Sequence, residues 1–394
     1  MASIISAGEV ARTATLQVPG FNAFGGVHCE TSALSKVLRH EGRYYSEALL
    51  FGLAGGIGFI YWTTKKMPIP FIGGRNGRFP EFLATACRRL RIGFEVLTTS
   101  SANKAFQQLK GALAEGHPAI VYGDIAYLPY FGTPRHFGGH AFVVYGINEA
   151  EGWVAVSDRG RAPCRVPLDD LARARASVAG PFPPRHAQLR LTIPRESVSL
   201  APIVQEAIAA TCLAFRRSPI NNLGLPGIQR LAAEVIAWPK RYVGPQLIDV
   251  LMDSYVNLEL AGTGGGAFRR LYADFLEEAQ ATLAMTELAA AVKQMRQLAD
   301  TWRAVATGFL PEAVPGLARC RQLLDARNQL FEEQGDDYDN RIATINAQIA
   351  AAKEEAQAGL DHMAADAILQ SVRALLLSVH ELEEACNATL MALT

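Results

Sequence analysis

The amino-acid pattern changes near residue 199, and this change constrains the fold more than any other feature of the sequence. Before it, short apolar runs typical of strands alternate with short helical patterns, and after it the strand patterns disappear. A chain of 394 residues is also longer than one hydrophobic core usually organises. We therefore predict two domains, an α+β domain over residues 1–195 and an all-helical domain over residues 196–394.

The helical domain is predicted from long amphipathic stretches rich in alanine, leucine, glutamine and glutamate. Their apolar stripes do not follow strict heptads, so we expect the last helices to form an antiparallel bundle. A dimer seam, and hence a homodimer, is the alternative. The stretches cover residues 203–215, 227–237, 245–260, 267–284, 287–307, 318–333, 338–356 and 363–393.

In the first domain the helical patterns come first and most strands later, which predicts an antiparallel sheet separated in sequence from the first helix. Gly152 marks a hairpin between two of the strands. The apolar segment 49–62 is interrupted by glycines and predicts tightly packed backbone. We expect helices at 29–41, 44–53, 80–90 and 102–115, a loop at 67–79, and strands at 92–99, 118–125, 140–149, 152–160 and 187–193.

Charge and cysteine content argue against several classes of protein. The 38 basic and 38 acidic residues balance, so no overall field attracts nucleic acid or anionic lipid. The six cysteines lie far apart without a C-x-x-C pair, which predicts neither a zinc site nor a disulfide framework. The start of the chain lacks the features of a signal peptide, and no segment reaches the roughly 18 apolar residues of a membrane span. We expect a soluble, cytoplasmic protein.

One cysteine is placed where a nucleophile would be. In the stretch FGGVHCETSALSKVLRHEG, glycines precede Cys29 and an apolar helical pattern follows it, with Gly42 as the expected stop. Cys29 therefore lies in the first turn of a helix, where free N–H groups and the helix dipole favour a thiolate. The alternative is that Cys29 is a small apolar residue that packs the helix against the sheet.

A cysteine nucleophile needs a base, and His140 is the best placed of the eight histidines. It begins the strand HAFVVYGIN, and Asp158 ends the next strand, so a hairpin brings the two side chains to one end of the sheet. Asp158 would then orient the imidazole. His28 adjoins the cysteine but points away from it, and His136 lies in the loop before the strand. The alternative is that His140 and Asp158 only satisfy a strand end and a turn.

The motifs together resemble known families. Cys29 at a helix start, HAFVV on a strand and an aspartate on the following strand resemble the papain-like cysteine peptidase fold, in its bacteriocin-leader-peptidase branch. More closely, they resemble the butirosin biosynthesis protein H family, together with the helical domain of unknown function that usually accompanies it. The stretches that carry this resemblance are GVHCETSAL, LLFGLAGGIGF, YGDIAYLPY, HFGGHAFVVYG, VSDRG and, in the helical half, NLELAGTGGGAFRRLYADFLEEA.

The resemblance implies an acyltransferase of natural-product biosynthesis. The family is named for an enzyme that moves an aminoacyl group from an acyl carrier protein to an amine of an aminoglycoside. For this chain it implies a phosphopantetheine thioester as donor arm, an amine-bearing small molecule as acceptor, and no bound metal or nucleotide. A thioesterase or amidase with the same three residues, and a scaffold protein without catalysis, are the alternatives.

Other residues complete the predicted site. Papain-like peptidases have a glutamine before the cysteine that donates to the oxyanion, and this chain has Asn22 there, which we expect to complete an oxyanion hole with the Cys29 N–H. This departure argues against ordinary peptidase activity. Asp124 is either a binding group for a cationic amine or the cap of a turn, and His136 is expected near the substrate.

The glycine-rich turn at 262–266 precedes Arg269 and Arg270, which we expect to bind the phosphate of the donor arm. The turn lacks the Walker lysine and follows a helix, so nucleotide binding is not expected. A purely structural turn is the alternative.

Overall fold

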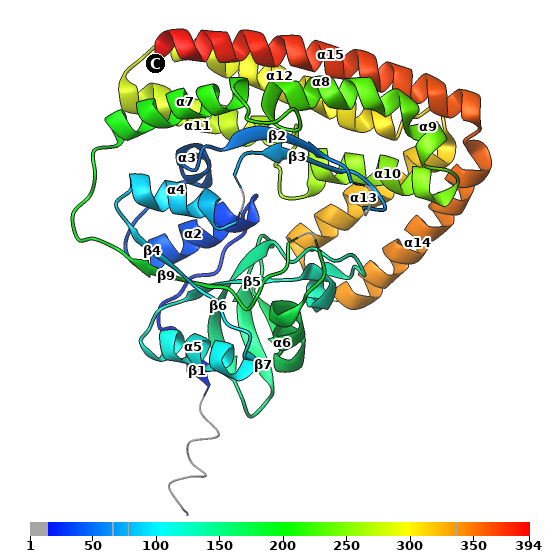
Figure 1. Cartoon of the computed structure of the whole chain (residues 1–394). Helices are drawn as coiled ribbons and strands as arrows, with labels where there is room; N and C mark the ends of the chain where they lie inside the picture. Colours follow the sequence, from blue (N-terminus) through cyan, green and yellow to red (C-terminus); the bar gives the residue numbers. More distant parts are fainter. Residues whose placement is uncertain (1–14, 65–66, 78, 181, 336) are drawn as a thin grey trace, which may run out of the picture. The chain divides into compact units, whose positions relative to one another are not determined.

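The computed structural model describes residues 15–64, 67–77, 79–180, 182–335 and 337–394, and Figure 1 gives the labels of their elements. The chain forms two compact units. The first contains the chain up to Ser46, Arg91–Glu196 and Leu330–Asp339, and the second contains Glu47–Leu90, Ser197–Gln329 and Asn340–Thr394. The units are therefore not two consecutive halves, because residues 47–90 join the helical unit and residues 330–339 join the unit with the main sheet.

Seven strands of the described chain form the sheet of the first unit, and all their pairings are antiparallel. The strand order is β4-β9-β5-β6-β7-β8, and β1 pairs with β6. The helices of this unit are α2 (Cys29–His40), α5 (Ala102–Ala114) and α6 (Leu168–Ala176). The strands are β1 (Leu16–Gln17), β4 (Gly93–Leu97), β5 (Ala119–Gly123), β6 (His140–Asn148), β7 (Trp153–Ser157), β8 (Cys164–Pro167) and β9 (Gln188–Thr192).

The central strand β6 is buried along its whole length, which matches its continuous apolar run. Helix α2 packs against β5 and β6. Residues of β5 and β6 also pack with α5 and α6 in one apolar cluster that includes Phe142 and Leu109. Two short 3-10 helices, Ile125–Tyr127 and Pro129–Phe131, follow β5 and lead toward the loop before β6. The helix with Cys29 and the start of β6 are thus fixed by the most buried part of the unit.

The second unit is helical apart from one hairpin. Its strands β2 (Ile57–Trp62) and β3 (Phe71–Arg75) pair antiparallel, and Phe51 stacks on Phe268 at 5.3 Å between ring centroids. Residues 47–90 are therefore part of this core. The helices are α3 (Glu47–Leu53), α4 (Glu81–Arg89), α7 (Leu200–Arg216), α8 (Gly224–Glu234), α9 (Trp238–Arg241), α10 (Pro245–Tyr255), α11 (Arg269–Leu283), α12 (Leu288–Phe309), α13 (Pro315–Glu333), α14 (Tyr338–Gly359) and α15 (His362–Leu393).

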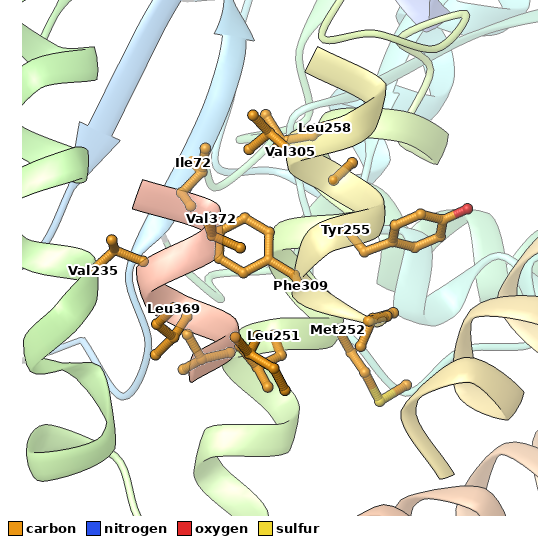
Figure 2. Close-up of a cluster of buried hydrophobic side chains, with 14 of the residues drawn as sticks. Ile72, Val235, Leu251, Met252, Tyr255, Leu258, Val305, Phe309, Leu369 and Val372 are labelled. Atoms are coloured by element: carbon orange, nitrogen blue, oxygen red, sulfur yellow. The ribbon is translucent and has the colours of Figure 1, made fainter. Parts of the chain in front are cut away.

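The core of the helical unit lies where α10, α12 and α15 meet the β2–β3 hairpin. Figure 2 shows Phe309 of α12 among Ile72 of β3, Val372 of α15 and Leu251 of α10. The long helix α15 packs along α12, and both contribute buried apolar residues at helical spacing. No helix among the described residues combines the length and the apolar character needed to span a bilayer.

The predicted fold class is confirmed: an α+β region with an antiparallel sheet precedes an all-helical region. The structure adds β1, β8 and α6, which the sequence did not reveal, and places β3 where a loop was expected. The segment of β3 is FIGGR, whose two glycines hide the strand pattern. The expected helix at 245–260 is α10 followed by a π-helix at Val256–Leu260.

Candidate active site

Helix α2 begins at Cys29, as the sequence predicts, and local contacts fix both of its ends. His28 is the N-cap, and its imidazole accepts a hydrogen bond from the Thr31 N–H at 3.5 Å. At the other end Gly42 has φ +75°, and the Arg43 N–H donates to the Leu38 carbonyl at 2.8 Å. Cys29 therefore lies at the positive end of a complete helix, and its side chain is partly exposed.

The hairpin of β6 and β7 brings His140 and Asp158 together. Val143 pairs with Ser157, so the residue after β7 lies beside the start of β6. Asp158 Oδ2 and His140 Nε2 are 2.6 Å apart, and the two residues are 3% and 5% exposed. The predicted pairing of these two residues is thus present in the structure.

The Asp158 carboxylate accepts two further hydrogen bonds. The Tyr130 hydroxyl donates to Oδ2 at 2.8 Å, and the Arg159 N–H donates to Oδ1 at 2.7 Å. Burial alone would raise the pKa of Asp158, but the charge and hydrogen bond of His140, followed by the charges of Arg159 and Lys36, hold this pKa below its usual value. The carboxylate is therefore charged, and its position is fixed from several sides.

Cys29 lies close enough to His140 to help raise the pKa of its imidazole. Because Nε2 of the imidazole is engaged with Asp158, Nδ1 is the nitrogen left for the sulfur. Burial acts to lower the pKa of His140, but the charge and hydrogen bond of Asp158, and then the interaction with Cys29, outweigh burial and raise this pKa to about 9. The imidazole beside the sulfur is therefore held in its protonated form at neutral pH.

Several contacts lock the start of α2 to the turn that carries Asp158. The ammonium of Lys36, which is 1% exposed, donates to the Asp158 carbonyl and to Ser32 Oγ, each at 2.6 Å. The Gly26 N–H donates to the Arg159 carbonyl at 2.9 Å. These contacts join the helix that begins at Cys29 to the turn that carries Asp158.

Asp124 and His136 form a second pair. The Asp124 carboxylate is fully buried and accepts hydrogen bonds from Ser177 Oγ at 2.6 Å and from the N–H groups of Ala126 and Phe137. His136 Nδ1 lies 2.7 Å from Asp124 Oδ2, and the His136 side chain is 45% exposed. Asp124 thus organises the loop between β5 and β6, as the turn-cap alternative predicted, and the role of either residue in binding substrate stays a prediction.

The remaining predicted site residues lie in different surroundings. Asn22 is exposed in the segment before α2, and its role at an oxyanion stays a prediction. Arg270 is partly exposed and lies 3.6 Å from Asp300. The prediction that Arg269 binds the donor phosphate does not fit its position, because its side chain is fully buried in the helical unit and pairs with Glu383 at 2.7 Å.

The glycine-rich turn before Arg269 also directs its backbone inward. The Gly266 N–H donates to Glu259 Oε2 at 2.8 Å, and the Gly265 N–H donates to Thr263 Oγ1 at 3.0 Å. Arg269 donates to the Gly74 carbonyl at 2.9 Å. These N–H groups stabilise the turn itself, so the structure agrees with the structural alternative for this motif.

The sequence did not reveal Tyr130 and Lys36 as parts of the site. Lys36 had a usable signal, because it lies one turn after Ser32 among the apolar residues Leu34, Val37 and Leu38, which indicates burial and a partner for its charge. Tyr130 had none, since its hydroxyl meets Asp158 only through the tertiary fold.

The other cysteines differ from Cys29. Burial raises the pKa of Cys87 to about 12, and burial with the nearby Asp158 charge does the same for Cys164. Within the described ranges, no three histidine, cysteine or acidic side chains gather as a metal site would require. Cys29 is the cysteine that combines partial exposure, a helix start and a histidine partner.

Two family models match parts of the chain. Residues 28–159 match the family model described as butirosin biosynthesis protein H, N-terminal. Residues 169–332 match a domain of unknown function, DUF4872. No curated protein matches the chain. The first match begins at His28 and ends at Arg159, so it spans Cys29, His140 and Asp158. The chain therefore carries a butirosin biosynthesis protein H N-terminal domain followed by a DUF4872 domain.

Proposed function

We propose that the protein is an acyltransferase that moves an acyl or aminoacyl group from a thioester to an amine through an acyl-Cys29 intermediate. The observation that carries this proposal is the buried pair of His140 and Asp158 beside Cys29 at the start of α2. The match to a butirosin biosynthesis protein H domain supports a biosynthetic enzyme. A carrier-bound donor follows from the resemblance stated above, and the phosphopantetheine arm would then present the thioester.

In the first half-reaction, the Cys29 sulfur attacks the thioester carbonyl. The attacking group is the Cys29 thiolate beside the protonated His140. A new C–S bond forms, and the old C–S bond breaks as the leaving thiolate takes the proton of His140. Asp158 holds the imidazole in position and stabilises its positive charge. The products of this step are acyl-Cys29 and the free thiol of the donor.

In the second half-reaction, a neutral amine attacks the acyl-Cys29 carbonyl. His140 takes the proton that the amine loses, the C–S bond breaks, and the Cys29 sulfur leaves as a thiolate beside the protonated His140. Water competes with the amine at this step, and a bound acceptor competes through the large effective concentration of a positioned reactant. The same three residues would give a thioesterase if no amine were bound.

The test measures product partition. The protein is incubated with an acyl phosphopantetheine thioester, with and without a panel of polyamines and aminoglycosides, and amide and free acid are quantified. We expect an amide with at least one amine, and a loss of at least about 10³-fold in Cys29→Ala. Cys87→Ala serves as the control with a buried cysteine of the helical unit. Free acid at equal rates with and without every amine would replace transfer by hydrolysis.

A further inference from the structure

A segment from the second half of the chain packs onto the turns that hold His140 and Asp158. Residues 330–335 and 337–339 contain the end of α13 and the start of α14, and they belong to the same compact unit as the main sheet. We call residues 330–335 and 337–339 the tip segment. Two groups of contacts connect the tip segment to the candidate active site.

The first group consists of aromatic contacts with Tyr130 and Phe131. The Phe331 ring stacks on Phe131 with centroids 4.8 Å apart and planes at 28°. Phe131 in turn meets His140 edge to face, with centroids 4.9 Å apart and planes at 83°. The hydroxyl of Tyr130 donates to Asp158, and the ring centroids of Tyr130 and Phe331 are 6.2 Å apart. The Tyr338 hydroxyl donates to the carbonyl of Tyr130. The tip segment therefore supports the turn that contacts both members of the pair.

The second group of contacts is made with the loop that follows Asp158. The Arg159 guanidinium lies over the Phe331 ring at 4.8 Å, and the Arg161 N–H donates to the Glu332 carbonyl at 3.0 Å. Cys164 Sγ donates to Gln334 Oε1 at 3.0 Å. A Cβ built on Gly160 would lie 2.8 Å from the Gln334 side chain, so the loop and the tip segment are in close contact.

These contacts affect both the geometry and the environment of the pair. Phe331 is 5% exposed and fills space beside Tyr130 and Phe131, so it helps keep water away from the imidazole. Attraction between Asp158 and a protonated His140 is stronger where water is excluded. Loss of the Phe331 ring would let the Tyr130–Phe131 turn relax and would admit water.

We propose that the tip segment is a positioning element for His140 and Asp158, with Phe331 as its principal positioning residue. The proposal rests on the proposed function in one respect, namely that the pair serves Cys29. It gives a role to the end of α13, which contains the last residues of the DUF4872 match.

The test uses alkylation of Cys29 in the full chain by iodoacetamide, followed by peptide mass mapping over a range of pH. This readout needs no acyl donor, so a failure of acyl transfer leaves it intact. We expect the wild-type profile to contain an ionisation near pH 9, where His140 loses its proton. In Phe331→Ala we expect the weakened attraction to Asp158 to outweigh the relief of burial, so this ionisation should move about one unit toward 6.5. Phe331→Leu should restore part of the shift.

Phe106→Ala is the matched control, because Phe106 packs against the same apolar cluster and has the Lys110 ammonium 5.7 Å from its ring centroid. We expect it to lower the melting temperature but to keep the wild-type alkylation profile. If Phe331→Ala does not fold, Tyr338→Phe, which removes one hydrogen bond, should move the profile in the same direction by less. Wild-type profiles in both tip variants would overturn the proposal. A wild-type profile without the His140 ionisation would instead contradict the pairing on which the proposed function rests.

Discussion

At the scale of single residues, the charge state of His140 follows from its neighbours. Burial favours the neutral imidazole, and the buried carboxylate of Asp158 favours the cation more strongly. Tyr130 and the Arg159 N–H occupy other lone pairs of that carboxylate, so its charge is retained inside the unit. A cysteine beside such a cation can lose its proton without leaving an isolated negative charge.

This arrangement predicts a pH dependence of stability. His140 has a pKa of about 9 in the folded protein and an ordinary value near 6.5 when unfolded. Between these values the folded state keeps a proton that the unfolded chain has lost, so the His140 contribution is full below pH 6.5 and disappears as pH rises through 9. Its size is roughly 3 kcal/mol.

The measurement is urea unfolding of the wild type and of His140→Gln at about pH 6 and about pH 9.5. We expect the difference in free energy of unfolding between the two proteins to shrink by roughly 3 kcal/mol at the higher pH. The comparison of the two proteins removes the contributions that they share. A difference that stays constant over this range would show that His140 has no raised pKa.

At the scale of elements, the loop between β5 and β6 is held by one buried carboxylate. Asp124 binds Ser177, His136 and the N–H groups of Ala126 and Phe137. Those hydrogen bonds outweigh the effect of burial and keep the pKa of Asp124 below its usual value. Because the loop leads directly into His140, its order contributes to the position of the imidazole.

We expect Asp124→Ala to lower the free energy of unfolding by roughly 2–3 kcal/mol, since it leaves buried donors without their acceptor. Glu95→Ala is the control, because Glu95 forms an exposed ion pair with Arg190 in the same unit and its loss should cost less than about 1 kcal/mol. Urea unfolding at neutral pH measures both. Equal losses in the two variants would contradict the role assigned to Asp124.

At the scale of the whole molecule, the sequence predicts what depends on neighbouring residues and misses what depends on distant ones. The start of α2 at Cys29 and the hairpin that joins His140 to Asp158 both follow from local patterns, so the sequence predicts their positions. The contact of Phe331 with Phe131 joins segments about 200 residues apart and leaves no local trace.

The same reasoning explains why the phosphate-binding role predicted for Arg269 does not fit its position. Arg269 follows a glycine-rich turn and begins a helix, which is the pattern of an anion site, but the pattern does not report burial. In the fold its guanidinium lies between the rings of Phe215 and Trp302 and binds Glu383. Similarly, the glycines of β3 hide a strand that only its pairing with β2 reveals.

The most direct test of the account is to find the acyl group on the enzyme. The protein is mixed briefly with an acyl thioester, quenched in acid, and analysed by intact mass and peptide mapping. We expect one acyl group on Cys29, formed slowly in His140→Ala and absent in Cys29→Ala, while Cys164, whose pKa is raised to about 12 by burial and by Asp158, stays unmodified. An adduct on another cysteine, or no adduct while amide is still formed, would contradict a mechanism through acyl-Cys29.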